Sequence, residues 1–124
     1  MRNEEFNELF RRRTKRFAVE ILRFLEIIPF NSATRIVTYQ LGKSGTSVGA
    51  NFRAFCRGRS KNERFAKSCI VVEEADETLY WLEICTETSY GNTETLTKLS
   101  QECLEILKVT GSIKDSMFPN NKFP

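Results

Sequence analysis

The stretch FRRRTKRFAVEILRFLEII, residues 10–28, decides the fold class of this chain. Its core-facing positions recur in steps of three and four, which places them along one side of an α-helix. They are Phe10, Thr14, Phe17, Ile21, Phe24 and Ile28, and Ala18, Leu22 and Leu25 widen the stripe. Because a proline disfavours helical geometry in the residue before it, Pro29 ends the predicted helix, whose broad stripe faces a core.

A second helix is predicted from Asn31 or Ser32, either of which can cap it, to Phe55. Its apolar positions are Ile36, Val37, Leu41, Val48, Phe52 and Phe55. Three glycines interrupt the segment LGKSGTSVGA, residues 41–50, and each costs about 1 kcal/mol relative to alanine in a helix. Either a neighbouring helix approaches closely there, or a loop separates two short helices. We expect one helix, bent or locally irregular at the glycines.

Two further helices follow the same spacing. The third opens on the capping-box pattern Ser60-Lys-Asn-Glu63 and ends at Tyr90-Gly91-Asn92, where Gly91 suits the left-handed position after a helix. Its predicted stripe is Phe65, Cys69, Val72, Leu79, Leu82 and Thr86, interrupted by Asp76. The stripe of the fourth is Leu96, Leu99, Cys103, Ile106, Thr110 and Ile113.

Four amphipathic helices joined by short connections predict an all-α fold, an antiparallel up-down-up-down four-helix bundle. At 124 residues the chain fits one domain. We expect this domain to span residues 1–115 and the polar tail, 116–124, to be frayed.

Composition excludes several classes of function. The chain has no histidine, which removes imidazole bases, Ser-His and Cys-His pairs and most zinc sites, so we expect no catalytic residues, no metal and no cofactor. Cys56, Cys69, Cys85 and Cys103 form no CxxC pair and are expected to pack in the core as free thiols. The N-terminus has no apolar core of a secretory signal and no run is long enough to span a membrane, which predicts a cytoplasmic protein.

Charge is distributed unevenly along the chain. Residues 1–67 carry 15 basic and 6 acidic side chains, a net charge of +9, whereas residues 68–124 carry 4 and 10, a net charge of −6. Arginine forks match phosphate oxygens, so the basic half provides candidate nucleic-acid contacts. They are Arg11, Arg12, Arg13, Lys15, Arg16, Arg53, Arg57, Arg59, Lys61, Arg64 and Lys67. The alternative is that the basic half only neutralises the acidic half, within one subunit or between subunits.

The acidic half concentrates its carboxylates on the third predicted helix. Glu74 and Glu77 lie three residues apart and can share a face. Di-iron bundles need Glu-x-x-His motifs, which this chain cannot form. We therefore expect these glutamates to form ion pairs with arginines of the second helix.

The stretch SGTSVGANFRAFCRGRSKNERFAKSCIVVEEADETLYWLEI, residues 44–84, resembles a bacterial four-helix-bundle family first described as proteins encoded within intervening sequences of large-subunit ribosomal RNA genes. The most specific pieces are Ser44 to Asn51, Arg57 to Ser60, Glu74-Ala75, Glu77-Thr78 and Tyr80 to Glu83. The resemblance extends loosely over residues 14–115. Asn51, Arg53, Arg57, Arg59 and Ser60 fall on its second-helix motif, and Glu74 and Glu77 on its acidic third-helix motif.

The resemblance implies a closed homopentamer with no enzymatic activity. A related branch serves as the accessory protein of diversity-generating retroelements, in which a basic pentamer engages a reverse transcriptase and nucleic acid. The chain departs from the family at Ala54, where an acidic residue is usual, at Glu73, where a basic one is usual, and at Phe55, which replaces a small residue. The swapped signs imply rearranged ion pairing.

The sequence therefore predicts a non-catalytic oligomeric binding module that contacts RNA or DNA phosphates through a basic surface. The alternative is a protein-protein interaction adaptor whose charge asymmetry serves subunit assembly. In the adaptor, the arginines are consumed by Glu74, Glu77 and their neighbours, whereas in the nucleic-acid module they stay exposed on a continuous face.

Overall fold

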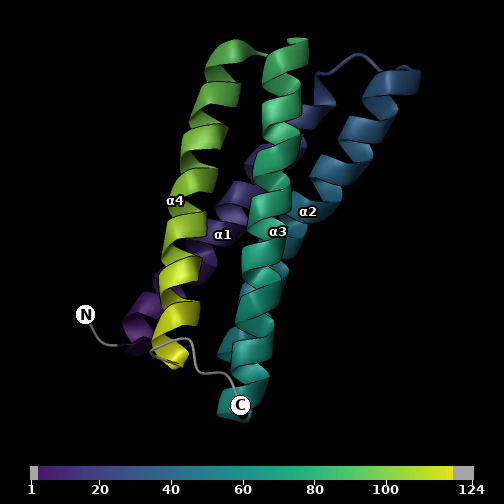
Figure 1. Ribbon diagram of the computed structural model, residues 1–124. Helices are drawn as coiled ribbons and strands as arrows, with labels where there is room; N and C mark the ends of the chain where they lie inside the picture. The colour runs from purple at the N-terminus through teal and green to yellow at the C-terminus, as the bar shows by residue number, and fades with distance from the viewer. Residues whose placement is uncertain (1–2, 119–124) are drawn as a thin grey trace.

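The computed structural model describes residues 3–118, and these form four helices (Figure 1). They are α1 (Asn3–Glu26), α2 (Ser32–Cys56), α3 (Lys61–Thr88) and α4 (Thr93–Met117). Connections of four or five residues join the helices at alternating ends, so that successive helices run in opposite directions. The predicted all-α four-helix bundle is confirmed. Residues 119–124 of the predicted tail lie outside the described residues, whereas α4 continues through Ser116 to Met117.

Side-chain caps fix where three of the helices begin. Asn31 is the cap of α2, and its side chain accepts hydrogen bonds from the amides of Ala33 and Thr34. Ser60 accepts from the amide of Glu63, as the capping-box pattern predicts. The residue in left-handed geometry directly after α3 is Ser89, with φ of 59°, so the assignment of that position to Gly91 was wrong, although Gly91 also has a positive φ.

The core is built on α1 as its spacing predicts. Phe10, Thr14, Phe17, Ile21 and Phe24 are all buried, and Ile28, just after the helix, is buried as well. The Thr14 hydroxyl donates to the carbonyl of Phe10, which satisfies the polar atom inside the core. The buried stripe of α1 is narrower than predicted, because Leu22, which was expected to widen it, is 48% exposed. On α2, Ile36 is 58% exposed and was wrongly assigned to the core.

Helix α2 is continuous through its glycines because α1 lies directly against them. A Cβ atom added at Gly45 would lie 3.0 Å from Ile21 Cγ2, and one added at Gly49 would lie 3.2 Å from the backbone carbon and oxygen of Thr14. The close approach of a neighbouring helix is therefore the correct alternative, and the loop is not. It places the two helices near enough to share one surface.

The predicted stripe of α3 was wrong in register. The buried residues are Ser68, Val71, Ala75, Thr78, Leu82 and Cys85, so only Leu82 was assigned correctly. Apolar residues surround this helix on every side, and the apolar period therefore does not mark a single face. Small and hydroxyl-bearing side chains face the core instead, and the Thr78 hydroxyl donates to the carbonyl of Glu74.

Helix α4 buries the positions that its spacing predicts, from Leu96 to Thr110, while Ile113 is half-buried. The four cysteines are free; Cys85 and Cys103 are buried and Cys56 and Cys69 are partly exposed. Burial raises the pKa of the Cys85 thiol to about 11 and that of Cys103 to about 12, so both thiols stay protonated at neutral pH.

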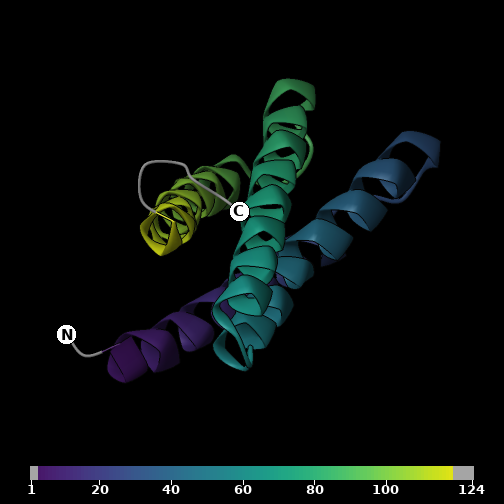
Figure 2. The ribbon, with the colours of Figure 1, turned by 60° about the horizontal axis from the view of Figure 1, so that its bottom comes forward.

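Helix α1 crosses behind α4 at an angle in Figure 1, and in the turned view of Figure 2 the two ribbons stand apart. The two helices touch over a short stretch only. Arg13 closes this seam through two hydrogen bonds to the Glu102 carboxylate, Nε to Oε2 at 2.8 Å and Nη2 to Oε1 at 2.7 Å. The hydrogen bond to Glu102 raises the pKa of Arg13. One arginine of the run 11–13 therefore belongs to the fold.

Candidate nucleic-acid interface

One edge of α1 carries Arg11 and Lys15 toward α2. Arg11, Lys15 and Ala18 repeat the four-then-three step of the buried stripe, one residue further along the helix. This offset rotates them by about 100° from the core, to the line where α1 meets α2. Because the glycines of α2 bring the two helices close, side chains from both helices border the same hollow.

A first hollow of about 390 Å³ lies between α1 and α2. Small residues form its floor, and basic side chains dominate its walls. The lining residues are Glu8, Arg11, Arg12, Lys15, Ala18, Thr46, Gly49, Ala50 and Arg53. The Thr46 hydroxyl donates to the carbonyl of Gly42, so this polar group is already committed to its own helix.

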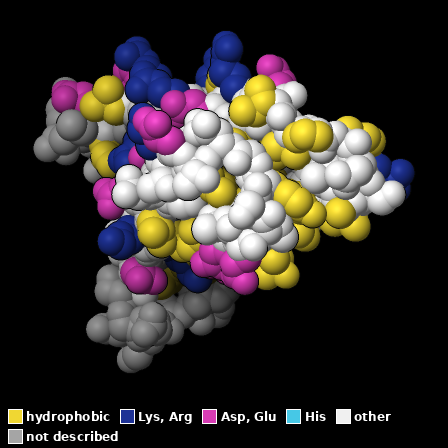
Figure 3. Space-filling view, turned by 90° about the horizontal axis from the view of Figure 1, so that it is seen from above, with side chains coloured by type: hydrophobic (Ala, Val, Ile, Leu, Met, Phe, Trp, Pro, Cys, Tyr) yellow, Lys and Arg dark blue, Asp and Glu magenta, His cyan; other side chains and the backbone are white. Residues whose placement is uncertain are grey.

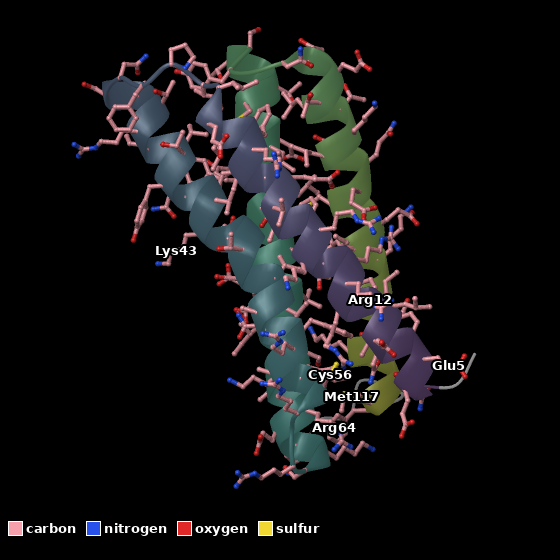
Figure 4. All side chains as sticks on the ribbon, turned by 180° about the vertical axis from the view of Figure 1, so that it is seen from behind. Glu5, Arg12, Lys43, Cys56, Arg64 and Met117 are labelled. Atoms are coloured by element: carbon pink, nitrogen blue, oxygen red, sulfur yellow. The ribbon has the colours of Figure 1, made fainter. Side chains whose placement is uncertain are left out.

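A second hollow of about 510 Å³ continues from the first toward the start of α3. It is lined by Ala50, Arg53, Ala54, Arg57, Arg59, Glu63 and Lys67, and it shares Ala50 and Arg53 with the first hollow. We call the two together the basic groove. Figure 4 shows this side of the molecule, with Arg12 on α1 and Arg64 near the turn between α2 and α3.

The basic groove gathers seven of the eleven basic residues that the sequence singled out: Arg11, Arg12, Lys15, Arg53, Arg57, Arg59 and Lys67. The other four do not line it. Arg13 is bound to Glu102, and Arg16 is exposed elsewhere on α1. Lys61 lies with its Nζ 4.7 Å from the centre of the Phe118 ring, and Arg64 donates to the carbonyl of Gly58 at 3.5 Å.

Most of the cations in the groove have no carboxylate partner. Arg12 forms an ion pair with Glu8 at 2.7 Å, between two well-exposed side chains. Within residues 3–118, the other ion pairs join Arg13 to Glu102 and Lys98 to Glu94, both away from the groove. Seven cations and two carboxylates, Glu8 and Glu63, therefore give the groove a strongly positive potential.

The acidic motif of α3 lies apart from these arginines. The part of the chain that the structure describes contains no ion pair between Glu74 or Glu77 and an arginine of α2, contrary to expectation. Burial raises the pKa of Glu74, as do the charges of Glu77 and Glu73, while Lys43 lowers it. Asn51 serves its own helix, since its Nδ2 donates to the carbonyl of Ser47 at 2.9 Å.

Sequence reasoning missed the floor of the groove. Ala18, Gly49 and Ala50 carry no chemistry of their own, but their small size creates the space between the basic walls. The signal was present in the sequence, because Gly49 and Ala50 lie about one helical turn before Arg53.

Within residues 3–118, no cluster of three or more cysteine, aspartate or glutamate side chains is arranged to hold a metal ion. The same residues include no helix with both the length and the apolar character needed to cross a bilayer.

Comparison with known proteins places the chain in a family. A solved structure from Bacteroides thetaiotaomicron, described as a protein with unknown function from the S23 ribosomal protein family, is 30% identical. The alignment covers 84% of this chain and 96% of that one, with a TM-score of 0.75. No curated protein matches. The model of the 23S rRNA-intervening sequence protein family matches residues 9–112, and the chain therefore belongs to that family.

Proposed function

We propose that this protein is a non-catalytic binding module that contacts the phosphates of RNA or DNA through the basic groove. One observation carries the proposal: cations from α1, α2 and α3 line one groove, and among them only the side chain of Arg12 forms an ion pair within the described residues. Phosphate contacts by lysine and arginine release condensed counterions, which drives binding at low salt.

The adaptor alternative has less support. It requires the arginines of α2 to be neutralised by Glu74, Glu77 and their neighbours. Within a single chain, Arg53 and Arg57 are exposed and form no ion pair with another residue of the range 3–118. The acidic face of α3 remains available to a protein partner. A reverse transcriptase, which the resemblance to retroelement accessory proteins suggested, is one such partner and remains part of the proposal.

We also propose that the chain assembles into a homo-oligomer, and the same resemblance suggests a pentamer. A patch of exposed apolar side chains supports assembly, because monomeric proteins rarely expose such patches. These side chains gather over the end where α1 meets α2 (Figure 3). They are Ile27, Phe30, Ile36 and Tyr39, each between 58% and 73% exposed. Light scattering tests the assembly: five chains of 14.4 kDa give about 72 kDa, and a 14.4 kDa particle contradicts it.

A cytoplasmic location is also proposed. The free cysteines support it, because a reducing compartment keeps thiols unpaired.

Binding measured at two salt concentrations tests the proposed function. We expect a labelled RNA to bind at low salt, with log affinity falling against log salt by about 0.7 to 0.9 for each phosphate neutralised. The variant Arg53→Glu/Arg57→Glu should lose about tenfold or more in affinity. Its matched control, Arg35→Glu/Lys108→Glu, changes net charge equally at exposed positions outside the groove and should bind nearly as wild type. No binding at low salt, or equal losses in both variants, contradicts the proposal.

A further inference from the structure

The walls of the basic groove stand on two sides of a floor made of small side chains. Arg11, Arg12 and Lys15 of α1 form one wall, and Arg53 of α2 and Arg57, directly after it, belong to the other. Between them, methyl groups and the bare backbone of Gly49 leave a trough. A trough with cations on both sides matches a convex ridge of negative charge, which is the shape of a sugar-phosphate backbone.

The cations within each wall are spaced by about one turn of a helix. Arg11 and Lys15 lie four residues apart, as do Arg53 and Arg57, so each pair is separated by about 6 Å along its axis. A duplex presents about one negative charge per 1.7 Å of its axis, and its phosphates are held in place before binding. A flexible single strand must instead be ordered on the same walls, which costs conformational entropy.

The exposed aromatic rings lie away from the groove. Phe30 and Tyr39 stand at the end where α1 meets α2, and Tyr80 lies on α3; none of them lines either hollow. Proteins that hold single strands use aromatic rings as platforms on which successive bases stack. The lining of the groove consists instead of charged, alanine, glycine and threonine residues, which suits contact with a backbone.

The lining of the groove also contains no amide side chain that could read a base edge. Asparagine and glutamine are typical readers of adenine, but Asn51 donates to the carbonyl of Ser47, and the Thr46 hydroxyl is bound to Gly42. Apart from Arg12, which pairs with Glu8, the arginines of the groove form no ion pair within residues 3–118, and phosphate oxygens are the acceptors that a duplex presents to them first.

From this arrangement we infer that the basic groove straddles the backbone of double-stranded nucleic acid and holds it without regard to base sequence. The inference rests on the proposed function and names its ligand class.

Four labelled probes of equal length test it: two RNA duplexes of about 16 base pairs with unrelated sequences, one unpaired strand, and one DNA duplex. We expect the two RNA duplexes to bind within about threefold of each other, and the single strand about tenfold or more weakly at the same salt. The Arg53→Glu/Arg57→Glu variant should lose the advantage of duplex over single strand, and the Arg35→Glu/Lys108→Glu control should keep it.

The four probes distinguish a failure of this inference from a failure of the proposed function. A single strand that binds as tightly as the duplexes, or a strong preference between the two RNA sequences, overturns the inference and leaves phosphate binding by the groove intact. Failure of every probe to bind at low salt overturns both. Equal binding of the DNA and RNA duplexes supports backbone recognition, and so does a preference for the RNA duplex, which identifies A-form geometry or the 2′-hydroxyl as the added feature.

Discussion

Helix α1 packs against its two neighbours by different means. Toward α2, Gly45 and Gly49 bring the helices so close that an added Cβ would touch Ile21 or the backbone of Thr14. Toward α4, the helices cross (Figure 1), and the Arg13–Glu102 pair spans the seam.

The difference separates the functions of adjacent arginines. Arg11 and Arg12 point along the close seam with α2 and line the basic groove, whereas Arg13 turns to α4 and is neutralised there. A run of like charges in a sequence is therefore divided by the packing of its helix into structural and surface members.

The largest effect is expected from filling the close seam. Gly49→Leu places a side chain against the backbone carbon and oxygen of Thr14, 3.2 Å from the new Cβ, which cannot move aside without displacing α1. We expect the free energy of unfolding to fall by about 3 kcal/mol, measured by chemical denaturation. An unchanged unfolding midpoint would show that the seam has room to spare.

The other seam is expected to depend on one polar pair. In a double-mutant cycle, Arg13→Ala and Glu102→Ala should show a coupling of about 1 to 2 kcal/mol, because the pair is bidentate and partly buried. The exposed pair of Arg12 and Glu8, four residues apart on α1, is the matched control and should couple by about 0.3 to 0.5 kcal/mol. Equal couplings would mean that the seam does not rely on Arg13.

The smallest effect concerns a glycine outside either seam. An added Cβ at Gly111 of α4 meets no atom within 4 Å, so Gly111→Ala should gain helix propensity without a clash. We expect the free energy of unfolding to rise by about 0.5 to 1 kcal/mol in the same denaturation assay. A loss of stability in the Gly111→Ala variant would instead indicate that α4 makes a contact at this position in an assembly of chains.

Much of the fold could be predicted from the sequence, and α3 shows where prediction stopped. The buried stripes of α1 and α4 were predicted correctly because their core positions keep the spacing of three and four. On α3 the apolar residues lie all round, so the face toward α2 could not be chosen by period alone. The buried face of α3 carries small side chains such as Ser68 and Ala75, and the carbonyl of Ala75 accepts a hydrogen bond from Cys103 Sγ of α4.

The candidate site was predicted in part. The sequence indicated the basic residues, but not that α1 and the α2–α3 turn would border one groove, since those segments are about 40 residues apart along the chain. It also did not show that Glu74 and Glu77 would stay apart from Arg53 and Arg57. Both outcomes depend on how the helices lie across one another.

The sequence by itself determined four helices, the capped starts of α2 and α3 and the sides that α1 and α4 turn to the core, because these follow from local spacing and hydrogen bonding. The tertiary structure alone decided which face of α3 is buried, which arginine of residues 11–13 is neutralised, and where the remaining cations meet. These features depend on contacts between residues distant in the chain, which local periodicity does not encode.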